Sequence, residues 1–192
     1  MALTPSTMLP LGTVAPAFTL PEPGSGKLVS LSDFAAAPAV VVAFLCNHCP
    51  YVQHLRRALA DFDSSYRGRG VQFIGINSND ALRYAADAPD KMAVEAKVAG
   101  WQFPYLFDAT QSIAKAYRAS CTPDFFLFDR ARMLVYRGQF DASRPGNGKP
   151  INGSDLRAAT DAVLTGKLPH VTQVPSIGCG IKWKPGNEPD YA

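Results

Sequence analysis

The strongest constraint on the fold is an apolar run from Ala39 to Leu45 that leads directly into Cys46. Continuous runs of β-branched and other apolar residues are typical of a strand buried on both faces of a sheet. Apolar residues then recur at helical spacing: Val52, Leu55, Leu59 and Phe62. We therefore predict a helix from Cys46 to about Arg67, entered straight from the central strand.

The other segments alternate between strand and helix patterns. We predict a β-hairpin from residues 18–20 and 28–31, strands at 71–76, 103–107, 125–128 and 134–136, and helices at 91–99, 110–118 and 155–165. Early strand–helix–strand units imply parallel pairing, whereas the late hairpin implies antiparallel pairing. The fold class is therefore α/β, with a mixed central sheet covered on both faces by helices.

The length of 192 residues is typical of one domain, which we assign to residues 1–192. Its core spans about 12–166. Residues 1–16 are an irregular lead-in, and residues 167–192 form a tail without periodicity, packed on the core.

Composition excludes several function classes. A net charge of +3 without a basic stripe argues against nucleic acid as a partner. No apolar run approaches the roughly 20 residues of a membrane helix, and the first residues lack a secretory signal, so we expect a cytoplasmic protein. Four cysteines are too few for a disulfide framework. The C-x-x-C pair at Cys46 and Cys49 therefore indicates catalysis or metal binding.

A cysteine at a helix N-terminus has the chemistry of a redox nucleophile. Unpaired amides and the helix dipole stabilise a thiolate and lower its pKa. We therefore expect Cys46 to attack, with Cys49 on the same helix face, roughly 5–6 Å away, as the resolving thiol. His48 would add positive charge beside Cys46.

Two other interpretations of this motif stay open. Structural zinc usually needs a second pair of ligands, for which the chain offers Cys121, Cys179 or a distant histidine. Simple core packing is the third interpretation. The position between a buried strand and an amphipathic helix favours dithiol redox chemistry.

A second motif, Cys121-Thr-Pro-Asp124, directly precedes a predicted strand. Proline is tolerated at the first residue of a strand, and we expect a cis bond before Pro123. C-x-x-C after a buried strand together with Thr-Pro before a late hairpin resembles the thioredoxin fold, a three-layer α/β/α sandwich. In that fold the cis-proline loop faces the cysteines.

Further segments resemble the redoxin branch of that fold (AhpC/TSA and TlpA-like proteins) and, within it, a peroxiredoxin-like subfamily described as thioredoxins or thiol–disulfide isomerases. These segments are Gly12–Phe18, Ser30–Phe34, Phe44–Val52, Gly75–Asp80, Phe103–Leu106, Thr122–Phe125 and Pro175–Trp183. The resemblance implies Cys46 and Cys49 as the redox pair and Pro123 as the cis-proline. It implies no cofactor and no resident metal. Protein disulfides or dithiols would be substrates, with an electron donor such as thioredoxin or glutathione. Many redoxins form dimers, so a homodimer is compatible with it.

The chain also departs from these patterns. Leu45 replaces the tryptophan that precedes the first cysteine of thioredoxin, and Asn47-His48 replaces its Gly-Pro dipeptide. Val40 stands where thioredoxin has a buried acid, which leaves His48 or water as proton acceptor for the resolving thiol. Cys49-Pro50 matches the peroxidatic cysteine and proline of peroxiredoxins, but Cys46 and Val42 replace the threonine and proline of that motif.

Two cysteines have open roles. Cys121 is either a small buried residue or an auxiliary thiol near the site. Cys179 either relays a disulfide from the Cys46–Cys49 pair or is packed in the tail. Asn79 and Asp80 follow a strand and are interpreted as loop caps, with the rim of the site as the alternative. Three functions remain as hypotheses: a dithiol oxidoreductase, a peroxidase, and a metal-binding module using Cys46, His48, Cys49 and Cys179.

Overall fold

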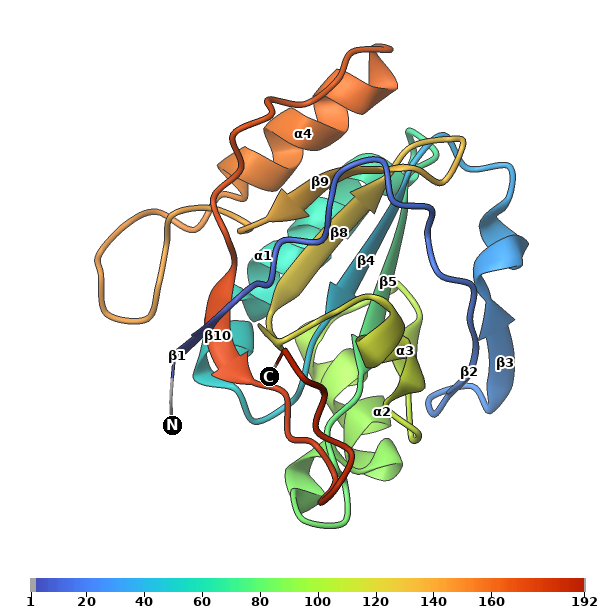
Figure 1. Cartoon of the computed structure of the whole chain (residues 1–192), viewed down its shortest axis with the longest axis vertical. Coiled ribbons are helices and arrows are strands. Elements are labelled where there is room, and N and C mark those ends of the chain that lie inside the picture. The colour runs from blue at the N-terminus through green and yellow to red at the C-terminus, as the bar shows by residue number, and fades with distance from the viewer. Residues whose placement is uncertain (1–2, 192) are drawn as a thin grey trace.

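A mixed five-stranded sheet lies at the centre of the computed structural model, which describes residues 3–191 (Figure 1). Its strand order is β6-β5-β4-β8-β9. The strands are β4 (Val40–Phe44), β5 (Gln72–Asn77), β6 (Tyr105–Phe107), β8 (Asp124–Phe128) and β9 (Leu134–Gly138). Pairings β4–β5 and β5–β6 are parallel, and β4–β8 and β8–β9 are antiparallel. The predicted mixed sheet and its central strand are confirmed.

Alternate side chains of β4 enter two separate cores. Val41 and Ala43 join a cluster on one face, and Val40 and Val42 join a cluster on the other. The first cluster packs under α1 (Pro50–Arg67), α2 (Pro89–Ala99) and α4 (Ser154–Leu164). The second packs under α3 (Ser112–Ala116) and the 3₁₀ turn η1 (Leu31–Phe34). The helices therefore cover both faces of the sheet.

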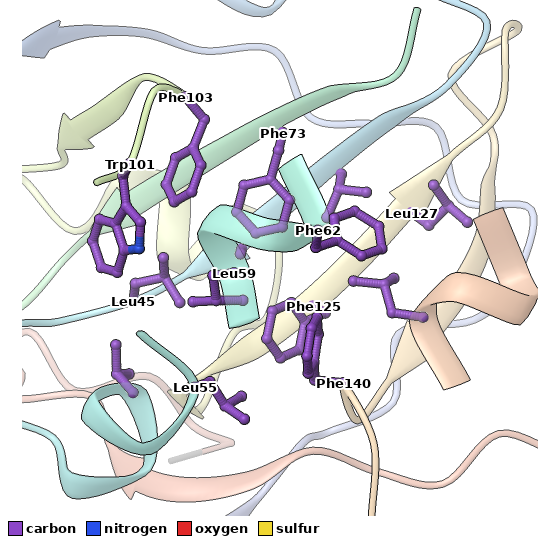
Figure 2. Close-up of a cluster of buried hydrophobic side chains, with 14 of the residues drawn as sticks. Leu45, Leu55, Leu59, Phe62, Phe73, Trp101, Phe103, Phe125, Leu127 and Phe140 are labelled. Atoms are coloured by element: carbon purple, nitrogen blue, oxygen red, sulfur yellow. The ribbon is translucent and has the colours of Figure 1, made fainter. Parts of the chain in front are cut away.

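Aromatic rings fill the first of these cores (Figure 2). Phe62 of α1 packs edge-on against Phe73 of β5 and against Phe140. Leu45, the last residue before Cys46, lies in the same cluster. The two cysteines belong to the same cluster and pack against a close-packed apolar layer.

The N-terminal hairpin is confirmed as β2 (Thr19–Glu22) and β3 (Lys27–Ser30). A capping box between Ser30 and Asp33 begins η1. A second short 3₁₀ turn, η2 (Ala85–Asp87), precedes α2.

Helix α1 begins at Pro50, and the prediction that it starts at Cys46 is wrong. Proline suits the first helical position because its fixed φ is helical and its missing N–H has no helical partner to lose. The backbone N–H of Asn47 instead bonds the carboxylate of Asp87, so residues 46–48 form a loop. Helix α3 is also shorter than predicted, because Gln111 and Arg118 adopt left-handed backbone conformations at its two ends.

The two ends of the described chain form a small sheet that the sequence did not predict. Its order is β1-β10-β7, all antiparallel, with β1 (Leu3–Pro5), β10 (Ile177–Gly180) and β7 (Cys121–Thr122). Within residues 1–16, the expected irregular lead-in is therefore wrong for 3–5, and residues 1–2 lie outside the described part. The tail of residues 167–191 contains a strand despite its lack of periodicity.

Glycine at position 178 makes this sheet possible. A Cβ atom there would lie 1.9 Å from the carbonyl oxygen of Thr122, so a side chain would force the two strands apart.

None of the helices in residues 3–191 combines the length and apolar character needed to cross a bilayer.

Candidate functional site

Cys46 and Cys49 lie at the carboxyl end of β4, and neither residue has exposed surface. Cys46 is in the loop after the strand, and Cys49 is the N-cap of α1. Thr122 contacts both sulfurs: its hydroxyl lies 3.3 Å from Sγ of Cys46, and its carbonyl oxygen accepts a hydrogen bond from Sγ of Cys49 at 3.1 Å. The expected cis bond between Thr122 and Pro123 is present. The loop that carries Pro123 therefore faces both cysteines.

The two thiols differ in acidity, in the opposite sense to the sequence prediction. A hydrogen bond from Cys46 lowers the pKa of Cys49 to about 5, with a further contribution from Cys179. Burial raises the pKa of Cys46, and the hydrogen bond that it makes to Cys49 raises it further. Cys49, and not Cys46, lies at the N-terminus of α1, where unpaired amides stabilise a thiolate. The assignment of the attacking thiolate to Cys46 stays a prediction.

Cys179 is the third thiol of the site. It lies on β10 in register with Thr122, is 4% exposed, and hydrogen-bonds to Cys49. Burial, followed by this interaction, raises the pKa of Cys179 to about 12. None of the four cysteines is part of a disulfide in the structure. Cys46, Cys49 and Cys179 form one group, which we call the three-thiol cluster.

His48 points to a carboxylate that sequence reasoning missed. Its Nδ1 lies 2.6 Å from Oδ2 of Asp87, a residue without exposed surface at the end of η2. The His48 ring also stacks on Tyr84, with centroids 5.5 Å apart. The hydrogen bond to Asp87 raises the pKa of His48.

Asp87 is held by several donors. Asn47 N–H donates to Oδ1 at 2.7 Å, and the Asn79 amide donates to Oδ2 at 2.8 Å. Burial opposes ionisation of Asp87, but hydrogen bonds from His48, Asn79 and Asn47 outweigh it and lower the pKa of the carboxyl. Asn79 thus lies at the site, while Asp80 caps its loop by accepting a hydrogen bond from Leu82 N–H. No local sequence pattern identifies Asp87 as a residue of the site, because its partners Asn47 and His48 lie in a different segment of the chain.

One group of side chains has the composition of a metal site. Ligand atoms of Cys46, His48 and Asp87 lie within 4.8 Å of one another. Both oxygens of Asp87 already accept hydrogen bonds, and His48 uses Nδ1 for one of them. A cation would have to displace these bonds, so the arrangement fits a hydrogen-bonded network better than a metal centre.

Cys121 lies in β7 but outside the three-thiol cluster. It is fully buried, and its thiol donates to the carbonyl oxygen of Pro123 at 3.7 Å. Burial raises its pKa. These properties are those of a packed, unreactive cysteine.

A buried ion pair lies beside the loop of Pro123. Arg137 and Asp124 have no exposed surface, and Nη2 of Arg137 lies 3.2 Å from Oδ2 of Asp124. The hydroxyl of Ser6 donates to the same carboxylate, and Nη1 of Arg137 donates to Thr7. The pair thereby joins the N-terminal segment to the strand that follows Pro123.

Comparison with known proteins gives two kinds of match. The chain is 54% identical to the crystal structure of a hypothetical protein from Sinorhizobium meliloti 1021, with a TM-score of 0.94 over 95% of this chain and 100% of that one. Over 121 residues it is 30% identical to "Putative peroxiredoxin Rv2521" of Mycobacterium tuberculosis, covering 61% of this chain and 69% of the relative.

More distant structures identify the fold. The thioredoxin domain of a thiol-disulfide oxidoreductase from Bacteroides vulgatus matches with a TM-score of 0.60 and 18% identity, over 78% of this chain and 97% of that one. The thioredoxin-like fold is thus confirmed. The family described as Redoxin matches residues 10–153. The chain therefore belongs to the Redoxin family, and a redox function follows from that membership.

Proposed function

We propose that the chain is a thiol–disulfide oxidoreductase whose redox centre is the Cys46–Cys49 pair. The observation that carries this proposal is the contact of both sulfurs with Thr122, next to Pro123. A thiolate and a neighbouring thiol are the reactants needed to open a substrate disulfide and then to close a new one.

The position of Cys49 at the N-terminus of α1, together with its lowered pKa, supports this residue as the first nucleophile. Its thiolate attacks a substrate disulfide, forming a mixed disulfide and releasing one substrate thiolate. Cys46 then loses its proton and attacks Sγ of Cys49, which closes the Cys46–Cys49 disulfide and releases the second substrate thiolate. An external dithiol or two glutathione molecules would reduce the pair again. Burial of Cys46 makes its deprotonation the demanding step.

His48 and Asp87 serve as positioning residues in this scheme. Asp87 fixes the backbone of Asn47 and the ring of His48, and thereby the loop between the cysteines. His48 is 20% exposed, so it can exchange protons with solvent. It lies between the two cysteines in the chain, and its imidazole can pass a proton outward near neutral pH.

Access is the main constraint on the substrate. Both sulfurs are covered, and β10 lies over Thr122 on the side of Cys49. A protein disulfide therefore reaches Cys49 only after β10 moves away, whereas a small disulfide needs a smaller opening. We propose protein thiols and disulfides as substrates, with thioredoxin or glutathione as electron donor.

A glutathione redox titration, stopped by alkylation and read by peptide mass spectrometry, tests the proposal. We expect a Cys46–Cys49 disulfide with a potential between about −270 and −120 mV. Cys121→Ser, outside the three-thiol cluster, is the matched control and should leave the midpoint unchanged. Absence of this disulfide at every glutathione ratio would refute the proposal.

The order of attack has its own test. With a disulfide-containing peptide, Cys46→Ser/Cys179→Ser should accumulate a mixed disulfide at Cys49, because no other thiol of the three-thiol cluster is left to resolve it. Accumulation at Cys46 in the Cys49→Ser/Cys179→Ser variant, and none at Cys49 in Cys46→Ser/Cys179→Ser, would reverse the roles.

Peroxide reduction is the second candidate function. It is favoured by the lowered pKa of Cys49 at the start of a helix that opens with Pro50, and by the relative named as a peroxiredoxin. The Cys49 thiolate would attack one peroxide oxygen, giving a sulfenic acid and hydroxide. Cys46 would then condense with it, forming the disulfide and water.

Hydrogen peroxide consumption with thioredoxin and its reductase tests this candidate. Turnover that disappears in Cys49→Ser and persists in Cys121→Ser supports it. A wild-type rate equal to that of Cys49→Ser excludes it, without affecting the redox titration above.

A further inference from the structure

The position of Cys179 is set by the same residue that contacts the redox pair. Cys179 is the register partner of Thr122, and the carbonyl oxygen of Thr122 accepts the hydrogen bond from Cys49. Cys49 also interacts with the thiols of both Cys46 and Cys179. Cys49 therefore has two neighbouring thiols, one on the loop after β4 and one on β10.

Strand β10 sets the position of Cys179 in the closed site. It is the middle strand of β1-β10-β7, so both of its edges are paired. Gly178 packs directly on the carbonyl of Thr122, and the hydroxyl of the preceding Ser176 donates to Gly138 O at 2.7 Å. Cys179 is thus a positioned side chain in a regular strand.

We propose that Cys179 is a third redox thiol and that Cys49 forms alternative disulfides, with Cys46 or with Cys179. This proposal rests on the redox function proposed above. In the exchange step the Cys179 thiolate attacks Sγ of Cys49 in the Cys46–Cys49 disulfide. The Cys49–Cys179 bond forms, the Cys46–Cys49 bond breaks, and Cys46 leaves as a thiolate that takes up the proton lost by Cys179. No electrons enter or leave, so the step needs no further oxidant.

The electrostatics of the cluster support this exchange. After burial, the largest causes of the high pKa of Cys179 are its hydrogen bond to Cys49 and the charge of that residue. Formation of a disulfide at Cys49 removes that charge. The pKa of Cys179 therefore falls when Cys49 is oxidised, and Lys182 lowers it further. Oxidation of the pair thus activates the third thiol.

The Cys46→Ser variant provides the test, because serine keeps a hydroxyl near Thr122 and leaves Cys179 as the one cluster thiol beside Cys49. The variant is oxidised with glutathione disulfide, alkylated, digested and analysed by mass spectrometry. We expect most of the protein to contain a Cys49–Cys179 disulfide and no glutathione. In Cys46→Ser/Cys179→Ser, Cys49 should instead carry glutathione. Accumulation of glutathione on Cys49 in Cys46→Ser, with Cys179 alkylated, would overturn the proposal.

A second substitution disturbs the position of β10 and keeps both Cys49 and Cys179. Gly178→Ala forces β10 away from Thr122, so Cys46→Ser/Gly178→Ala should form the Cys49–Cys179 disulfide at least tenfold less than Cys46→Ser alone. Gly24→Ala is the matched control, since a Cβ there has nothing within 4 Å. Equal disulfide yields in the two double variants would contradict the role of β10.

The outcomes separate this inference from the proposed function. Suppose that wild-type protein forms the Cys46–Cys49 disulfide and that Cys46→Ser carries glutathione on Cys49. The proposed oxidoreductase function is then retained, and Cys179 has no part in its mechanism. Wild-type protein that forms only Cys49–Cys179 overturns the redox pair and leaves Cys179 as the partner of Cys49.

Discussion

Nδ1 of His48 lies 2.6 Å from Oδ2 of Asp87, so the histidine of the C-x-x-C motif is paired with a carboxylate. The carboxylate offsets the positive charge that the sequence led us to expect beside Cys46. Asp87 also raises the pKa of Cys46 through its own charge, after the larger effects of burial and Cys49. The pair therefore fixes the loop between the cysteines, and its charge does not favour a thiolate on Cys46.

Asp87→Asn should lower the pKa of His48, because the hydrogen bond to the carboxylate is the largest cause of its elevation. NMR titration of the imidazole protons measures this value directly. Asp90→Asn is the matched control: Asp90 is exposed, pairs with Lys91 and should leave His48 unchanged. An equal pKa of His48 in wild type and Asp87→Asn would show that Asp87 does not control it.

The same pair predicts a pH dependence of stability. The raised pKa of His48 stabilises the fold fully below its ordinary value of 6.5, and this contribution disappears as pH rises through the raised value. The lowered pKa of Asp87 stabilises the fold above its ordinary value of 3.8, and this contribution disappears as pH falls through the lowered value. The difference in unfolding free energy between wild type and Asp87→Asn should therefore be largest between pH 3.8 and 6.5. Urea unfolding at pH 5 and pH 9 checks this, and a difference that grows toward pH 9 would contradict it.

Ionisation of Cys49, in which the residue gives up its hydrogen bond to the carbonyl oxygen of Thr122, should leave one thiolate in the reduced protein at neutral pH. Because the pKa of Cys49 is lowered to about 5, thiolate absorbance at 240 nm should rise with a midpoint near that pH. Cys49→Ser should lose the transition, and Cys121→Ser should keep it. Cys46→Ala should move the midpoint upward, since the hydrogen bond from Cys46 is the largest cause of the shift. A first transition near 9 in wild type would contradict the assignment.

Arg137→Met should destabilise the protein by about 3–5 kcal/mol, because it leaves the carboxylate of Asp124 buried without its partner. Arg69→Met is the control: Arg69 and Asp161 form a pair with both side chains about half exposed, and its loss should cost less than about 1 kcal/mol. Denaturant unfolding measures both. Similar losses of unfolding free energy in the two variants would show that the buried ion pair stabilises the fold no more than the exposed one.

The sheet and its helices were predictable because their signals are local. Continuous burial makes the β4 segment apolar at every position, and the spacing of Leu55, Leu59 and Phe62 follows the side of α1 that packs on the sheet. The start of α1 was also readable: proline at position 50 is a first-turn residue, which makes Cys49 the N-cap. Weighting that signal over the cysteine spacing would have placed Cys49, and not Cys46, at the start of the helix.

The remaining parts of the site depend on tertiary contacts. Asp87 reaches Asn47 and His48 from a separate loop, and no spacing rule connects these positions. Strand β10 has only four residues, two of them glycine, so it carries neither alternation nor strong β propensity. Its pairing is set by the backbone of Thr122, which periodicity does not reveal.

The late position of β10 in the chain has a consequence for biosynthesis. Every other strand and helix of the described fold precedes β10, and its partners β1 and β7 are distant in sequence. Pairings of this kind form slowly, because a long loop must close before any contact is gained. We therefore expect a nascent chain to expose Cys46 and Cys49 while its central sheet is already folded. The newly made protein is then most vulnerable to oxidants and thiol-seeking metal ions in the interval before β10 docks.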